Sequence, residues 1–156
     1  MARRRIKRSN GGFRLNLPDN ERDLLAHLLP QLRELLTAEP TPGDERVRRL
    51  FPTAYPDDPE KDAEYQRFMR EELVSSRVNS IETVERTMHQ SQLSADELAA
   101  WMSAVNGVRL VLGTMLDISE ELELSHVDEA DPNIGGYTLY GYLSMLLEEI
   151  VQAQLD

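Results

Sequence analysis

Four long segments of this chain repeat apolar residues at the spacing of an α-helix, and this pattern constrains the fold more than any other feature. Apolar side chains that recur every three to four residues form one helix face, and that face must be buried against another element. The sequence therefore predicts a mainly α protein, a helical bundle of about four long helices. These helices are expected over residues 18–36, 60–89, 94–116 and 134–155.

Local signals refine these helices. Ser94 and Glu97 have the spacing of a capping box, in which two side chains satisfy unpaired N–H groups at a helix start. Pro30 interrupts the first helix, and we expect a kink or a break there because an interior proline removes a hydrogen bond. Tyr65 and Phe68 belong to the apolar pattern of the second helix, so they are expected to face the core.

A β-hairpin is predicted before the first helix. Residues 6–8 and 13–17 flank Ser9-Asn10-Gly11-Gly12, and Asn-Gly favours a two-residue turn whose central residues have positive φ. An isolated hairpin is only marginally stable, so it must lie on the helices. No strand pattern follows residue 17. We therefore expect one domain over residues 1–156, with a basic arm and hairpin at 1–17 and the bundle at 18–156.

The connections are expected to differ in character. Residues 38–60 hold six prolines and glycines, including Pro52 and Pro56, and are expected to pack along the body with a helical turn at residues 44–51. Residues 117–133 form a strongly acidic loop.

Charge is divided unevenly along the chain. Residues 1–18 carry six basic and no acidic side chains, whereas the whole chain has a formal net charge of −11. An acidic body repels nucleic acid and anionic membranes, while a basic arm can contact either.

Cysteine is absent, which excludes disulfides, thiolate metal sites and thiol redox chemistry. No apolar run suits a membrane span or a secretory signal, so we expect a cytoplasmic protein.

The sequence contains no recognisable catalytic constellation. It has no Gly-x-Ser-x-Gly elbow and no glycine-rich phosphate loop, and its three histidines stand alone. Residues 129–135 loosely resemble a calcium loop, but the glycine is displaced and Tyr140 stands where glutamate is required. We therefore expect no enzyme activity, no cofactor and no bound metal, and a solvated acidic loop before the last helix.

Arg109 is a charged residue in an otherwise apolar stretch. A buried guanidinium needs a carboxylate partner, because desolvating it alone is costly. A structural ion pair with Asp117 or with a glutamate of the second helix is the main expectation. An exposed arginine and a ligand-binding arginine remain alternatives.

The basic arm also allows more than one interpretation. It contains Arg3, Arg4, Arg5, Lys7 and Arg8. These side chains could neutralise phosphates of a nucleic acid, with strong salt dependence, or bind a protein partner. The third alternative is that the arm folds against its own acidic body or only keeps the chain soluble.

The segment Trp101–Asp117, WMSAVNGVRLVLGTMLD, resembles the signature segment of DUF2017, an actinobacterial family of proteins. The order of a hairpin, a leucine-rich helix, Tyr55-Pro56-Asp57 and a final helix with Tyr137 and Tyr140 agrees over nearly the whole chain. Members typically lie beside the adaptor of the Clp protease and near genes of sulfur-carrier cysteine synthesis. The resemblance implies an oxidative-stress transcriptional regulator that works with an alternative sigma factor. The redox form of that activity depends on a Cys-x-x-x-Cys pair, which this chain lacks.

The sequence and the resemblance together favour a non-enzymatic regulatory or adaptor protein. It is expected to contact a protein of the transcription machinery without thiol redox sensing. Direct nucleic-acid contact through the arm, and a ligand-binding or enzymatic bundle built on Arg109, are the alternatives. No membrane partner is expected, and a homo-oligomer remains open.

Overall fold

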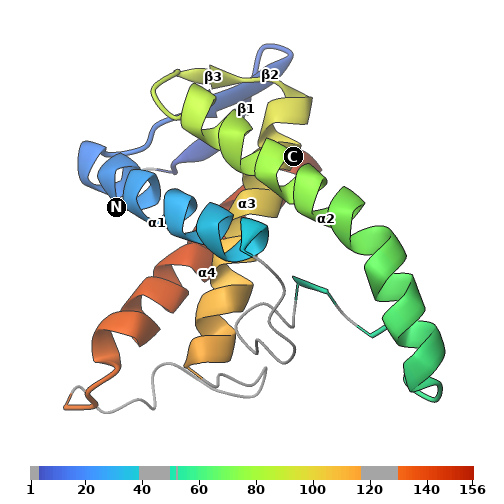
Figure 1. The fold of residues 1–156 in the computed structure, drawn as a ribbon. Helices are drawn as coiled ribbons and strands as arrows, with labels where there is room; N and C mark the ends of the chain where they lie inside the picture. Colours follow the sequence, from blue (N-terminus) through green and yellow to red (C-terminus); the bar gives the residue numbers. More distant parts are fainter. Residues whose placement is uncertain (1–3, 39–49, 52, 117–129) are drawn as a thin grey trace.

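The computed structural model describes residues 4–38, 50–51, 53–116 and 130–156, and it is mainly α, as predicted (Figure 1). Four helices are accompanied by a small antiparallel sheet. In chain order the elements are β1 (Ile6–Ser9), β2 (Gly12–Leu15), α1 (Asp19–Thr37), α2 (Pro59–Thr87), β3 (Gln92–Leu93), α3 (Ala95–Met115) and α4 (Ile134–Leu155).

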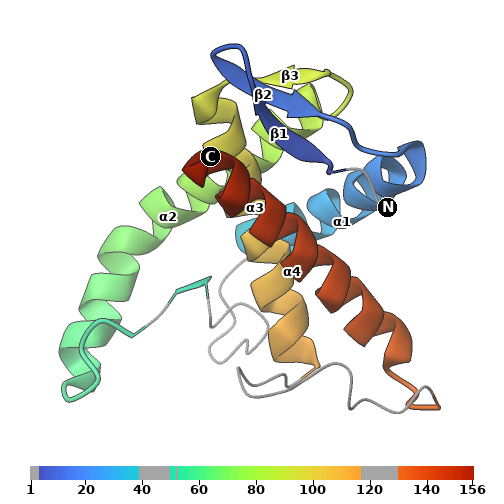
Figure 2. The ribbon, with the colours of Figure 1, turned by 180° about the vertical axis from the view of Figure 1, so that it is seen from behind.

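The central element is α3, which packs against both α2 and α4 and also contacts α1. Both ribbon views show that the helices splay rather than lie parallel, and that the first half of α2 extends away from the other helices (Figures 1 and 2). The small sheet covers the end of the molecule where α2 meets α3. One consequence is that the two halves of α2 lie in different surroundings.

The hairpin is confirmed, with Asn10 and Gly11 at φ 41° and 80° between β1 and β2. Phe13 and Leu15 are buried on the inner face, as their alternation requires. The structure also contains β3, which pairs with β2 so that Phe13 lies opposite Leu93. The expectation of no strand after residue 17 was therefore wrong, because two residues are too short to show an alternating pattern.

The first helix is continuous through Pro30, so the expected break does not occur. Pro30 itself is exposed, while Leu25, Leu29 and Leu32 on the opposite side are buried. Burial of these leucines on both sides of the proline offsets the lost hydrogen bond.

In the connector, residues 39–49 and 52 lie outside the described residues, as does most of the turn expected at 44–51. Leu50 is fully buried, which confirms packing of the connector on the body there.

The capping box of α3 is confirmed. Glu97 N–H donates to Ser94 Oγ at 3.1 Å, and Ser94 N–H donates to Glu97 Oε1 at 2.8 Å.

Within the described part of the chain, α3 is the one helix long and apolar enough to suit a membrane span. Several apolar side chains of α3 belong to the core, where Trp101 and Leu98 are completely buried.

Trp101 joins α3 to α2 through a buried hydrogen bond. Its indole N–H donates to Thr87 Oγ1 at 2.8 Å, and the Thr87 hydroxyl donates to the Thr83 carbonyl at 2.7 Å. Thr87 is fully buried, so neither group can turn to water instead.

We predict that Thr87→Val lowers the free energy of unfolding by about 1–3 kcal/mol, because the shape is kept while the indole N–H loses its acceptor. Thr138→Val is the matched control, since the Thr138 hydroxyl is exposed and donates only to a carbonyl of its own helix. Urea denaturation of both variants measures the effect. Equal stability of the two variants would contradict the proposed role of the Trp101–Thr87 hydrogen bond.

Candidate protein-interaction surface

The basic arm folds back on the chain wherever the structure describes it. Arg4 pairs with Asp156 at 3.1 Å, and the Arg8 guanidinium donates to the Gln154 carbonyl at 3.0 Å. Arg3 lies outside the described residues. Lys7 is exposed on the outer face of the sheet, where it lies opposite Arg14. The arm is therefore largely attached to the end of α4, in agreement with the alternative that it folds against its own body.

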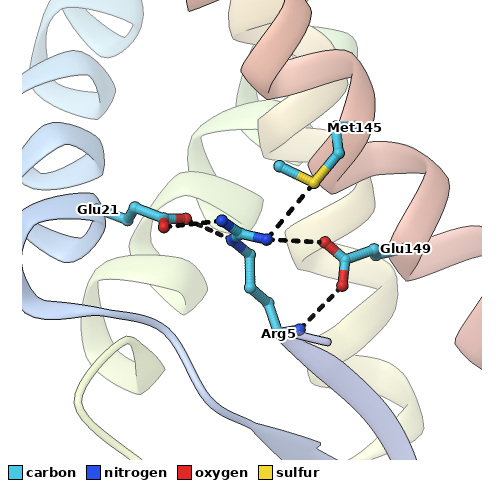
Figure 3. Close-up of polar contacts among 4 residues, drawn as sticks. All are labelled: Arg5, Glu21, Met145 and Glu149. Atoms are coloured by element: carbon cyan, nitrogen blue, oxygen red, sulfur yellow. Dashed lines mark hydrogen bonds and ion pairs between the residues drawn. The ribbon is translucent and has the colours of Figure 1, made fainter. Parts of the chain in front are cut away.

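Arg5 is the most extensively bonded residue of the arm (Figure 3). Its Nε and Nη2 donate to the two carboxylate oxygens of Glu21 on α1, at 2.6 and 2.9 Å. Its Nη1 donates to Glu149 on α4 at 3.3 Å and contacts the sulfur of Met145 at 3.5 Å. Its backbone N–H donates to the other oxygen of Glu149 at 2.8 Å. One side chain thus joins the hairpin to two helices.

Electrostatics at Arg5 follow from this geometry. The hydrogen bond to Glu21 raises the pKa of Arg5, so the guanidinium stays charged. Burial by itself raises the pKa of Glu21, but the hydrogen bonds from Arg5 and Tyr142 and the positive charge of Arg5 together outweigh it and hold that pKa below its usual value of 4.5. Burial also raises the pKa of Tyr142, whose phenol lies beside Glu21. With two carboxylates against one guanidinium, Arg5 has no spare positive charge for an external anion.

Arg109 is half-buried between α3 and α4 and bonds to neutral groups. Its Nε donates to Ser144 Oγ at 2.8 Å and its Nη1 to Asn106 Oδ1 at 3.4 Å, while its guanidinium carbon lies 5.0 Å from the ring centre of Tyr140. Asp117 lies outside the described residues, so an ion pair between the two stays a prediction. Within those residues, no carboxylate pairs with Arg109.

The first half of α2 carries an exposed surface that the sequence pattern did not reveal. Phe68 is 83% exposed and Tyr65 is 37% exposed, although both were expected to face the core. That expectation was wrong, because no described element covers this part of α2, whereas Ile81 and Val84 in its second half are completely buried. Helical periodicity shows which residues share a face, but it does not show whether another element covers that face.

An open groove of about 740 Å³ runs along this face of α2. Phe68 lies at one end, and Ala100 of α3 contributes to the wall. Between them the lining is acidic or small and polar, and includes Glu71, Glu72 and Ser75. Such a surface can bind another macromolecule, but it holds no converging nucleophile, base or metal ligands. Over the described part of the chain, no three His, Cys, Asp or Glu residues cluster as metal ligands would.

Comparison with known proteins places the chain in a family. A family model described as "Domain of unknown function (DUF2017)" matches residues 3–154. The chain belongs to the DUF2017 family. This confirms the resemblance seen in the segment at residues 101–117.

Curated relatives of this DUF2017 chain carry a regulatory name. Proteins named "Oxidative stress regulator AosR" from Mycobacterium bovis and Mycobacterium tuberculosis are 29% identical over 131 residues. The match covers 70% of this chain and 58% of the relatives, so the chain spans little more than half of their length. No solved structure matches the chain.

We predict that Glu21→Gln weakens the attachment of the hairpin, lowering the free energy of unfolding at pH 7 by about 1–3 kcal/mol. Because the folded-state pKa of Glu21 is lowered, its stabilising effect is complete above pH 4.5 and is lost as the pH falls through the folded-state pKa. The difference between wild type and Glu21→Gln should therefore shrink as the pH is lowered from 7 to about 3.

Denaturant titrations at several pH values measure this difference. Glu148→Gln is the control, because Glu148 is exposed on α4 and forms no ion pair with a described residue. A difference between wild type and Glu21→Gln that stays constant with pH would show that the Arg5–Glu21 pair does not contribute in this way.

Proposed function

We propose that this DUF2017 member is a non-enzymatic, cytoplasmic regulatory protein that acts by binding a protein of the transcription machinery. The observation that carries the proposal is the exposed first half of α2, with Phe68 at 83% exposure, in a chain whose curated relatives are named regulators. Aromatic side chains are enriched at the centres of protein interfaces, so an aromatic ring left in water on a projecting helix marks a candidate contact surface.

The proposal assigns no thiol chemistry to the chain. The sequence contains no cysteine, so a disulfide or a sulfenic acid cannot report oxidant here. Any response of this chain to oxidative conditions must therefore use something other than a thiol. Regulation by protein contact needs only a stable surface, which α2 provides.

Direct nucleic-acid binding is supported less well. Arg4, Arg5 and Arg8 each bond to groups of the chain itself, which removes donors that phosphates would need. The exposed cations Lys7 and Arg14 remain on the sheet, but the chain as a whole is strongly acidic. No observation favours nucleic acid over protein as the partner.

We predict that the immobilised full chain retains purified actinobacterial RNA polymerase or one of its sigma factors at low and at physiological salt. Quantitative pull-down measures the retention, with bovine serum albumin as the control bait. If neither the polymerase nor any sigma factor is retained, even at low salt, the result would count decisively against a role in transcription.

A further inference from the structure

Phe68 and the groove beside it combine one exposed aromatic ring with a row of acidic and small polar side chains. Beyond Glu71 and Glu72, the lining includes the small residues Ser75 and Ser76 of α2, and Ala100 of α3 also contributes. Small side chains on this face of α2 leave room for a bulky group of a partner. An exposed aromatic ring next to such a hollow allows mutual insertion, in which Phe68 contacts the partner while the partner fills the groove.

The charge of the groove selects the kind of partner. Glu71 and Glu72 are exposed, and neither forms an ion pair with any residue that the structure describes. The lining residues include no lysine or arginine. These carboxylates attract a basic partner and repel nucleic acid and anionic membranes.

The same charges disfavour a second copy of this chain as the occupant. If two copies paired through α2, Glu71 and Glu72 of both would be brought together at the contact. Like charges placed opposite one another are costly when water is removed from between them. A partner of another sequence can supply cations at these positions instead.

The projecting half of α2 is held in place before any partner binds. Asp58 accepts a hydrogen bond from Lys61 N–H at the helix start, and Asp62 Oδ1 accepts from the backbone N–H groups of Ala54 and Tyr55 at 2.8 and 3.0 Å. The Tyr55 ring packs edge-on against Tyr65, with ring centres 5.9 Å apart. A preformed surface loses less conformational entropy on binding than a segment that must first fold.

The polar groups of the groove point to a helix rather than an extended strand as the partner. The Ser80 and Thr83 hydroxyls already donate to the carbonyls of Ser76 and Asn79. No strand edge is available along α2 to pair with the backbone of an extended segment, whereas a helix satisfies its own backbone.

We propose that the groove between Phe68 and Ala100 is the docking site for a basic amphipathic helix of a partner protein. The inference rests on the proposed function, because it names the surface through which the chain would contact its partner. In this arrangement a lysine or arginine of the partner pairs with Glu71 or Glu72, and an apolar residue of the same helix packs against the exposed ring of Phe68.

The test uses a defined probe, a synthetic amphipathic helical peptide of leucine and lysine, with a leucine–glutamate peptide of the same pattern as control. Amide chemical shifts of the full chain in NMR spectra locate the contact, and fluorescence anisotropy measures the affinity. We expect the lysine peptide to shift residues of the groove and the glutamate peptide to leave them unchanged. Phe68→Ser and the double variant Glu71→Lys/Glu72→Lys should each weaken binding about tenfold or more.

Two control variants keep the interpretation specific. Leu155→Ser removes another strongly exposed apolar side chain, at the end of α4, and Glu148→Lys reverses an exposed charge on α4. Both should leave binding unchanged. An equal loss in Glu148→Lys, or shifts spread over the whole surface, would show nonspecific attraction to an acidic protein and overturn the proposal.

Two further outcomes separate this inference from the proposed function. Concentration-dependent dimerisation that Phe68→Ser abolishes would show that a second copy covers the groove, which overturns a basic partner. Retention of polymerase or a sigma factor that the Phe68 and Glu71/Glu72 variants leave intact would reject this surface while the proposed function stands. Specific groove binding of the lysine peptide without retention of any transcription protein would support the surface and reject the transcription role.

Discussion

The ion-pair cluster around Arg5 is the constraint on which the arrangement of the N-terminal part depends. A short sheet of this kind has little stability of its own, and its position must be fixed by contacts with the helices. Arg5 supplies the polar part of that contact through Glu21 on α1 and Glu149 on α4, while Phe13 and Leu15 supply the apolar part. A half-buried ion pair adds little net stability, but it disfavours alternative arrangements in which either charge would be left unpaired.

The same cluster changes the meaning of the basic arm. In the sequence, a run of arginines before an acidic chain is compatible with binding to phosphates. In the structure, Arg4, Arg5 and Arg8 are bonded to the chain itself, with Arg8 at Gln154 near the end of α4 and Arg4 at Asp156 just after it. The arm therefore connects the two ends of the chain, and the attraction between basic arm and acidic body is largely internal.

The division of α2 into a buried and an exposed half is the feature most relevant to function. Its second half contributes Ile81, Val84 and Thr87 to the core, where Thr87 accepts the hydrogen bond of Trp101. Its first half projects beyond α3 with Phe68 in water. One continuous helix thus joins this exposed surface directly to the core.

The sequence by itself determined the local structure of this protein. The Asn10-Gly11 turn, the Ser94–Glu97 capping box, the four helices and the family membership could all be inferred from residues close together in the chain, because turns, caps and helical faces depend on neighbours within a few positions. Only the tertiary structure decided that Arg5 meets Glu149, that β3 joins the sheet, and that Phe68 stays uncovered. These outcomes depend on which distant elements come together, and a helix with the same apolar period can have one half buried and the other exposed.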